Sequence, residues 1–109
     1  MRSDIMFYVQ ESQGTFDPAR KIFRAKKSRF QRNGLPDIHL TYSIKQIPID
    51  VGLEVKTKSG RQSDSQKIFE RDVLDVHGFY FIVRSVEDVI NALNKVKAEV
   101  EDRIKRAGL

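Results

Sequence analysis

Two carboxylates, a lysine and a glutamine occur in the middle of this 109-residue chain at spacings that suit phosphate chemistry. Asp37 follows a proline, and Glu54 comes seventeen residues later with Lys56 two positions beyond it. Gln66 follows after ten more residues. Side chains alternate along a β-strand, so Glu54 and Lys56 would share one face. Because hard divalent cations prefer carboxylate oxygens and an adjacent ammonium group can counter phosphate charge, the pattern predicts a metal-dependent site for phosphodiester hydrolysis.

The elements predicted around these residues would bring them together. A turn over 33–36 delivers Asp37 to the start of a strand over 37–42, and residues 43–50 are predicted to form a hairpin connection to a second strand over 51–58. A helix is predicted from Ser63 to about residue 77, with Ser63 and Gln66 at capping-box spacing. Five apolar residues over 79–83 predict a strand covered on both faces, and Ser85 is predicted to cap a last helix over 86–106.

The first third of the chain is predicted to contain a strand over 5–10, a turn over 14–18 and an exposed strand or hairpin arm over 21–30. The order β-β-β-β-α-β-α predicts a compact α/β fold with a small mixed sheet flanked by helices. A chain of this length forms one domain. We therefore expect a single domain over 1–109, with basic N-terminal strands over 1–33, a core over 34–96 and a C-terminal helix to about residue 106.

The net charge of +5 is concentrated in the same N-terminal third. Residues 1–33 hold eight Lys and Arg against three acids, whereas the remaining twelve basic and twelve acidic residues cancel. A basic stretch with interspersed aromatic residues can follow a phosphate backbone, although a solvated basic hairpin would have the same composition. The candidate nucleic-acid contacts are Arg20, Lys21, Arg24, Lys26, Lys27, Arg29 and Arg32, joined by Lys58 and Arg61 beside the second strand, where ordinary turn charges are an equal alternative.

From Gly34 to about Val96 the chain resembles the VRR-NUC (virus-type replication-repair nuclease) branch of the PD-(D/E)xK superfamily. The ordered motifs behind this resemblance are those at 34–38, 53–57, 59–63, Gln66, 78–85 and 87–88. The resemblance implies a restriction-endonuclease-like core. It also implies that Asp37, Glu54 and the backbone carbonyl of Val55 bind Mg²⁺ or Mn²⁺, and no organic cofactor is expected.

The same resemblance implies roles for the remaining residues. Lys56 would orient or deprotonate the attacking water, Gln66 would hold that water or a phosphate oxygen, and the products would carry a 5′-phosphate and a 3′-hydroxyl. The substrate implied is DNA, preferably branched, because stand-alone members of the family resemble Holliday-junction resolvases. We expect the cytoplasm of a bacterial or phage-infected cell, with a non-catalytic DNA-binding or interaction module of a replication or repair complex as the alternative function.

The chain departs from the family at its N-terminus. Many relatives begin with a helix that contributes a further acidic residue, and here only six residues precede the strand-like segment at 7–9. Glu11 is the nearest acid that would substitute as an additional metal ligand, and a partner chain is the other source. The last helix carries an apolar seam that could bind a second copy in a homodimer or pack on the sheet, with an end that frays from Ile104. The seam consists of Val89, Leu93, Val96, Val100 and Ala107.

Other classes of protein are disfavoured by composition. The chain has no cysteine, which excludes disulfides and thiolate metal sites. No apolar run approaches the roughly 20 residues of a membrane span, so no membrane partner is expected. His39 and His77 are predicted to be structural, since the family pattern gives His39 no role and His77 suits a helix C-terminus.

Overall fold

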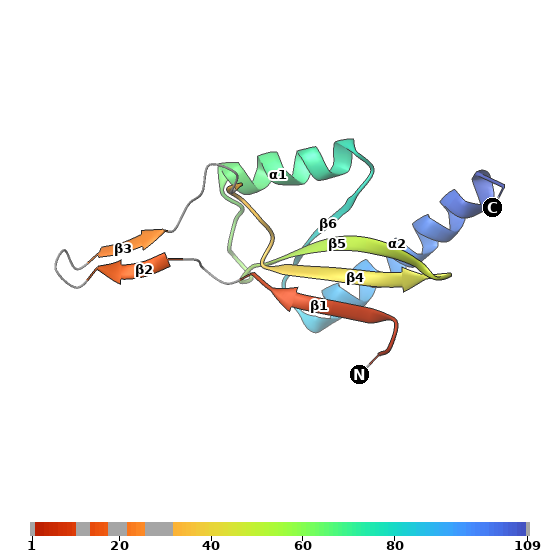
Figure 1. Ribbon diagram of the computed structural model, residues 1–109, viewed down its shortest axis with the longest axis horizontal. Coiled ribbons are helices and arrows are strands. Elements are labelled where there is room, and N and C mark those ends of the chain that lie inside the picture. Colours follow the sequence, from red (N-terminus) through yellow and green to blue (C-terminus); the bar gives the residue numbers. More distant parts are fainter. Residues whose placement is uncertain (1, 11–13, 18–21, 26–31, 109) are drawn as a thin grey trace.

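The computed structural model describes the backbone of residues 2–10, 14–17, 22–25 and 32–108, and the side chains of residues 2–10 and 32–108. The chain forms an α/β fold (Figure 1). Its elements are β1 (Ile5–Val9), β2 (Gly14–Asp17), β3 (Ile22–Ala25), β4 (Ile38–Ile44), β5 (Ile47–Val55), α1 (Asp64–Asp75), β6 (Phe79–Val83) and α2 (Val86–Arg106).

The central sheet is mixed, as predicted. Its strand order is β1-β4-β5-β6, with antiparallel β1–β4 and β4–β5 pairs and a parallel β5–β6 pair. β2 and β3 form a separate two-stranded antiparallel sheet. The turn predicted over 14–18 is therefore wrong for residues 14–17. Gly14 and the proline at 18 suggested a turn, but pairing with a strand several residues away determines the conformation of this segment.

The hairpin predicted over 43–50 is present, but its connection is shorter than predicted, because β4 and β5 are joined by a tight two-residue turn. Lys45 and Gln46 have φ values of 50° and 65°, and Ile44 pairs directly with Ile47. Positive φ at both central residues matches the right-handed twist of the flanking strands. Neither residue is the glycine or asparagine that announces such a turn in a sequence. The second strand therefore begins at Ile47 and ends at Val55, rather than running from 51 to 58.

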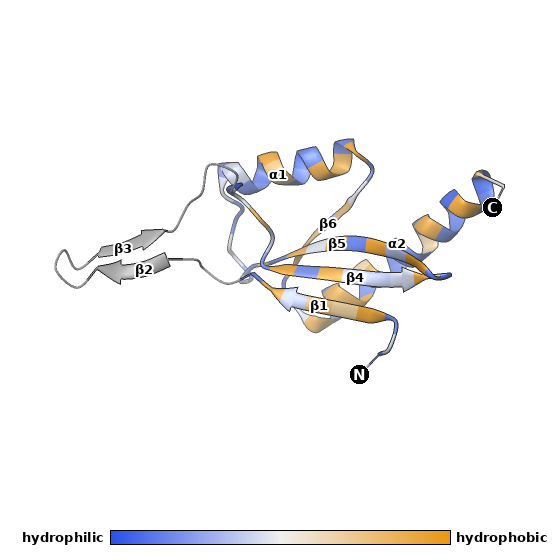
Figure 2. Cartoon of the chain, in the orientation of Figure 1, coloured by the Kyte–Doolittle hydropathy of each residue, from blue (hydrophilic) through white to orange (hydrophobic). Residues whose placement is uncertain are grey.

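Alternation along the strands directs one face of the sheet toward α2. Leu40 and Tyr42 of β4 and Val51 and Leu53 of β5 are buried on this face. They pack with the apolar stripe of α2, and apolar and polar residues alternate around that helix (Figure 2). Ser85 caps α2 as predicted, accepting a hydrogen bond from the Asp88 N–H. β6 is covered on both faces, because Tyr80 points toward α1 and its neighbours in sequence point toward α2.

The seam on α2 belongs to this core. Leu93, Val96 and Val100 are at most 6% exposed, so the interpretation of the seam as an unoccupied dimer surface is wrong. Ile104 packs against the same cluster and the helix continues to Arg106, so the end does not fray at Ile104. Two strands cover this stripe, because α2 contacts both β4 and β6.

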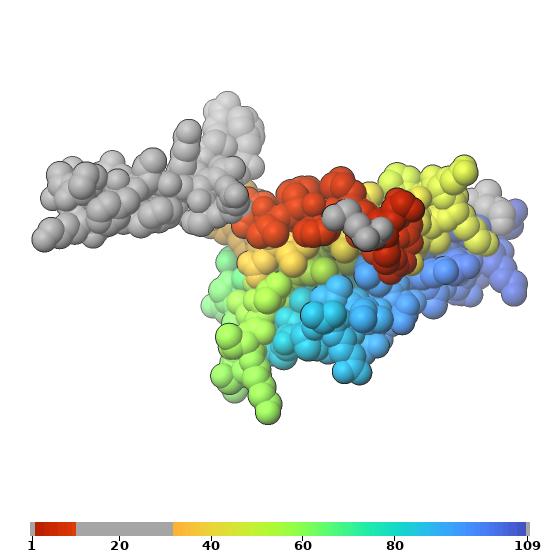
Figure 3. Space-filling view, turned by 90° about the horizontal axis from the view of Figure 1, so that it is seen from below, coloured from red at the N-terminus to blue at the C-terminus, as the bar shows by residue number. Residues whose placement is uncertain are grey.

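The opposite face of the sheet is covered only in part. α1 packs on β6 through Phe69 and Tyr80, whose ring centroids are 6.2 Å apart, and none of its residues is buried. β1 lies at the sheet edge and its side chains reach the surface, with Phe7 and Tyr8 more than half exposed (Figure 3). Among the described residues, neither helix combines the length and apolarity that a bilayer crossing requires.

Candidate active site

Asp37 and Glu54 meet at the end of the β4–β5 pair. Asp37 immediately precedes β4, where Ile38 pairs with Leu53, so one further step of the antiparallel register sets Asp37 opposite Glu54. The Asp37 carboxylate accepts a hydrogen bond of 2.9 Å from the Val55 N–H. This bond takes the place of the next backbone hydrogen bond between β4 and β5, and it therefore fixes the Asp37 side chain against β5.

Glu54 is the one buried charged residue among the described side chains, with 1% of its surface exposed. Its Oε1 accepts a hydrogen bond of 2.7 Å from Gln66 Nε2 and lies 3.6 Å from Lys56 Nζ. Its Oε2 accepts a hydrogen bond of 3.3 Å from the Tyr80 hydroxyl. Both oxygens are therefore held, and Glu54 and Lys56 lie on one face of the strand as predicted.

The pKa of Glu54 lies above its ordinary value. Burial is the largest cause, followed by a hydrogen bond with the Asp37 carboxyl and by the negative charge of Asp37. Lys56 and Tyr80 act in the opposite direction but do not cancel the rise. The charge of Asp37 thus opposes the ionisation of Glu54, and a bound cation would relieve this excess of negative charge.

The backbone at the end of β5 contributes a further oxygen. In a β-ladder the N–H and C=O of one residue face the same neighbouring strand, and those of the next residue face the other. The Val55 N–H meets Asp37, whereas the Lys56 N–H donates to the Val83 carbonyl at 3.1 Å. The Val55 carbonyl is therefore on the Asp37 side of the strand.

Gln66 joins the site through the start of α1. The predicted capping box is present: Ser63 Oγ accepts from the Gln66 N–H at 3.2 Å, and Gln66 Oε1 accepts from the Ser63 N–H at 2.9 Å. Because the amide oxygen is occupied by the cap, the amide nitrogen is directed at Glu54. Gln66 therefore contacts an acidic side chain of the site, and its expected contact with water or phosphate stays a prediction.

Gly34 allows the loop before Asp37 to lie against the first turn of α1. Its φ is +80°, and a Cβ at this position would overlap the Ser65 carbonyl group and stand 2.9 Å from the Gln66 nitrogen. Only glycine combines that backbone conformation with so close an approach. The glycine therefore brings the Asp37 loop and Gln66 to the same end of the sheet.

Sequence reasoning missed two residues that support the site. Tyr80 is buried beside Glu54, and burial raises the pKa of its phenol, so it remains a hydrogen-bond donor. Arg84 Nη1 donates to the carbonyl oxygens of Thr57 and Gly60, which holds the turn after β5. The polar end of Tyr80 within an apolar strand was the available signal for the first residue; nothing local marked the second.

The predicted basic contacts are only partly within the described residues. Arg32 pairs with Asp72, and its guanidinium lies 4.9 Å from the centroid of the Phe69 ring. Lys58 and Arg61 are exposed just beyond the end of β5. Arg24 has a described backbone but no described side chain, and the remaining basic candidates lie outside the described residues: Arg20, Lys21, Lys26, Lys27 and Arg29. Glu11, the candidate for an additional metal ligand, also lies outside them.

Neither histidine contacts the carboxylates. His39 stacks on Tyr8, with ring centroids 5.0 Å apart, and the carbonyl of His77 accepts from Arg103 Nη1 at 2.8 Å. Within the described side chains, no three residues among His, Cys, Asp and Glu converge to hold a metal ion. Comparison with family models, curated proteins and solved structures finds no match to this chain.

Proposed function

We propose that this chain is a metal-dependent endonuclease that hydrolyses DNA phosphodiester bonds and prefers branched or otherwise structured DNA. We also propose that its sheet and helices form a PD-(D/E)xK core of the VRR-NUC type. The single observation that carries the proposal is the convergence of Asp37, Glu54 and Lys56 at one end of the β4–β5 pair. Alternation along β5 accounts for the Glu54–Lys56 pair, whereas Asp37 is seventeen residues earlier and reaches the pair only through the pairing of β4 with β5.

The donor set fits a hard divalent cation. Asp37 and Glu54 would hold Mg²⁺ or Mn²⁺ with the Val55 carbonyl, and all three donors are oxygens of the kind that these ions bind. The raised pKa of Glu54 supports the assignment, because a cation would stabilise the ionised form that burial and Asp37 disfavour. When bound, such a cation polarises the phosphate and lowers the pKa of a coordinated water.

The side chains around the carboxylates have distinct functions in this proposal. Lys56 is only 19% exposed, and its ammonium group is held 3.6 Å from Glu54 Oε1, where it can orient a water molecule and counter charge on the phosphate. Gln66 and Tyr80 donate to the two oxygens of Glu54 and so fix the orientation of that carboxylate. Lys58 and Arg61 lie beyond the same strand end, where they would contact the DNA backbone.

Resolution of a four-way junction requires two cuts, so we propose a homodimer with two sites related by a two-fold axis. The apolar stripe of α2 cannot supply the contact, because the sheet already covers it. Another surface must therefore join the two copies. Sedimentation of the protein at micromolar concentration, with and without four-way DNA, measures the assembly directly.

The proposal is tested by cleavage of linear, flapped and four-way DNA in EDTA, Mg²⁺ and Mn²⁺. We expect cutting only with a cation, faster cutting of the branched forms, and loss of cutting in Asp37→Asn. Lys56→Ala should bind the cation without turnover. Asp75→Asn, which removes an exposed acid at the far end of α1, should cut normally. DNA binding without cleavage under every condition would instead support the non-catalytic DNA-binding module.

A further inference from the structure

A pocket of about 340 Å³ opens on the α1 face of the sheet, next to the two carboxylates. Pro36, which precedes Asp37, and Gly52, which precedes Glu54 by two residues on the same face of β5, both line it. A Cβ at Gly52 would stand 3.0 Å from Pro36 Cγ and 3.4 Å from Tyr80 Cδ2. The floor is therefore open because position 52 has no side chain. The volume lies in the range of small-ligand sites, roughly 300 to 1,000 Å³.

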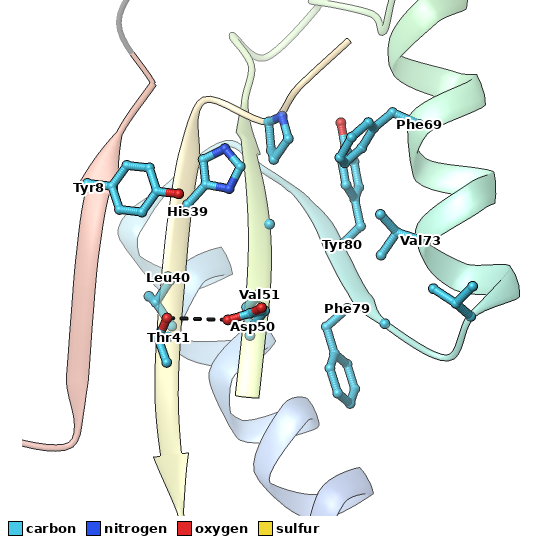
Figure 4. Close-up of a pocket in the computed structure, with 14 residues that line it drawn as sticks. Tyr8, His39, Leu40, Thr41, Asp50, Val51, Phe69, Val73, Phe79 and Tyr80 are labelled. Atoms are coloured by element: carbon cyan, nitrogen blue, oxygen red, sulfur yellow. Dashed lines mark hydrogen bonds between the residues drawn. The ribbon is translucent and has the colours of Figure 1, made fainter. Parts of the chain in front are cut away.

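Aromatic rings stand on both sides of this floor. Tyr8 and His39 stack with an interplanar angle of 10° on one side, and the Phe69–Tyr80 pair stands on the other (Figure 4). Tyr8 is 55% exposed although it belongs to the sheet. Exposed flat π-surfaces of this kind bind flat rings by stacking, and stacking tolerates any base because every base has a π-face.

The pocket also offers polar groups that match the edge of a base. His39 Nε2 is buried beside the pocket and has no hydrogen-bond partner among the described residues, which is costly. Asp50 is exposed and accepts from Thr41 Oγ1 at 3.4 Å, at the other end of the floor. Nucleobase edges carry both donors and acceptors, and the exposed Asp50 carboxylate in the pocket lining can accept from such a donor, whereas an apolar peptide side chain offers it none.

We propose that this pocket, the base pocket, binds an unstacked nucleobase of the DNA strand whose phosphate lies at Asp37 and Glu54. The proposal rests on the proposed nuclease function and names the feature of the substrate that the protein selects. A base inside a duplex is paired and stacked, and extruding it costs a few kcal/mol. A base at a branch point, flap or frayed end avoids most of that cost. The base pocket therefore gives a physical reason for a preference for branched DNA.

The test measures binding in EDTA, so that cleavage plays no part. The probe is an oligonucleotide containing one 2-aminopurine, used as a single strand and as a perfect duplex; a fully abasic strand of the same length, which carries no fluorescent base, is measured by competition against it. We expect the full-length protein to bind the single strand best and to quench its fluorescence by stacking. Tyr8→Ala should weaken this binding by about 5- to 150-fold, the equivalent of about 1–3 kcal/mol of stacking.

Phe7→Ala provides the matched control, because Phe7 is 56% exposed on the other face of the same strand. It should change the affinity less than twofold. The abasic strand should bind the unaltered protein as weakly as Tyr8→Ala binds the intact strand, with no further loss when the two changes are combined. If Tyr8→Ala does not fold, Tyr8→Leu keeps the apolar bulk and removes the ring. Equal effects of the Tyr8 and Phe7 variants, or equal binding of single strand and duplex, would overturn the proposal.

Two further measurements separate the possible causes of failure. Deoxyadenosine monophosphate, a base without a strand, should compete weakly; competition as strong as that of the oligonucleotide would overturn the assignment to a DNA strand. Cleavage of flapped DNA in Mg²⁺ is measured in parallel. Cleavage with no effect of Tyr8→Ala on binding refutes the base pocket and leaves the nuclease intact. Stacking without cleavage supports the base pocket and refutes the nuclease.

Discussion

Gln66 connects the start of α1 to the acidic site through a single amide group, and Gln66→Ala tests that connection. The change removes a 2.7 Å hydrogen bond to a buried carboxylate, worth about 1.5–3 kcal/mol, and a 2.9 Å bond from the Ser63 N–H, worth about 0.5–1.5 kcal/mol. Alanine returns a few tenths of a kcal/mol in helix propensity. The expected net loss is about 2–4 kcal/mol of unfolding free energy, or a fall in Tm of about 8–16 °C for a domain of this size.

Ser63→Ala separates the two contributions. It removes the side-chain cap at a cost of about 1 kcal/mol, but its backbone N–H can still donate to Gln66, whose amide still reaches Glu54. Gln66→Glu keeps the acceptor for Ser63 and replaces the donor with a second acid beside Glu54. It should therefore be at least as destabilising as Gln66→Ala at neutral pH.

The assay is thermal and urea unfolding followed by circular dichroism in EDTA, with DNA cleavage in Mg²⁺ as the second measurement. Cleavage by Gln66→Ala should fall about tenfold to a hundredfold, because Glu54 loses the contact that orients it. If Gln66→Ala and Ser63→Ala lower Tm equally, the bond to Glu54 contributes nothing and the connection between cap and site is refuted.

Three other changes test separate parts of the structure. Without metal, Glu54 binds protons more tightly in the folded than in the unfolded state, so the unfolding free energy should fall as pH rises above about 4.5, and Glu54→Gln should abolish this slope in thermal unfolding in EDTA. Gly34→Ala should cost about 2–4 kcal/mol in urea unfolding, because the methyl group overlaps the Ser65 carbonyl at positive φ. Mg²⁺ at a hundred times its Kd should raise the unfolding free energy by about 2.7 kcal/mol, and Asp37→Asn should remove this gain in a thermal-shift titration.

Each of these predictions has an outcome that contradicts it. A pH slope that persists in Glu54→Gln would assign the effect to another group. Gly108→Ala is the control for Gly34→Ala, since Gly108 has φ of +76° with no atom within 4 Å of its Cβ, and equal losses would mean that overlap with α1 is unimportant. A metal-induced shift of normal size in Asp37→Asn would show that the cation binds elsewhere.

Local signals in the sequence were sufficient for several elements. The Ser63–Gln66 capping box and the Ser85 cap begin α1 and α2 where predicted, because capping involves residues only three positions apart. The apolar run over 79–83 forms β6 as predicted, because five consecutive apolar residues suit a strand that is covered on both faces. The turn at Lys45 and Gln46 was missed because its residue types do not favour positive φ, so pairing of the flanking strands must impose it.

The approach of Glu54 and Lys56 follows from the alternation of side chains along one strand, and it was predictable on that ground alone. The contacts of Tyr80 with Glu54 and of Gly34 with Ser65 join segments that are 26 and 31 positions apart, and no local pattern encodes them. The same holds for the α2 stripe, whose amphipathic period would suit a partner helix or a sheet equally well. Periodicity and capping are properties of neighbouring residues, so they were sufficient to place both helices and β6 and to supply the chemical types at the site. The β4–β5 turn, and the surfaces that the elements bury against one another, depend on the register and layering of the whole sheet, which no local segment specifies.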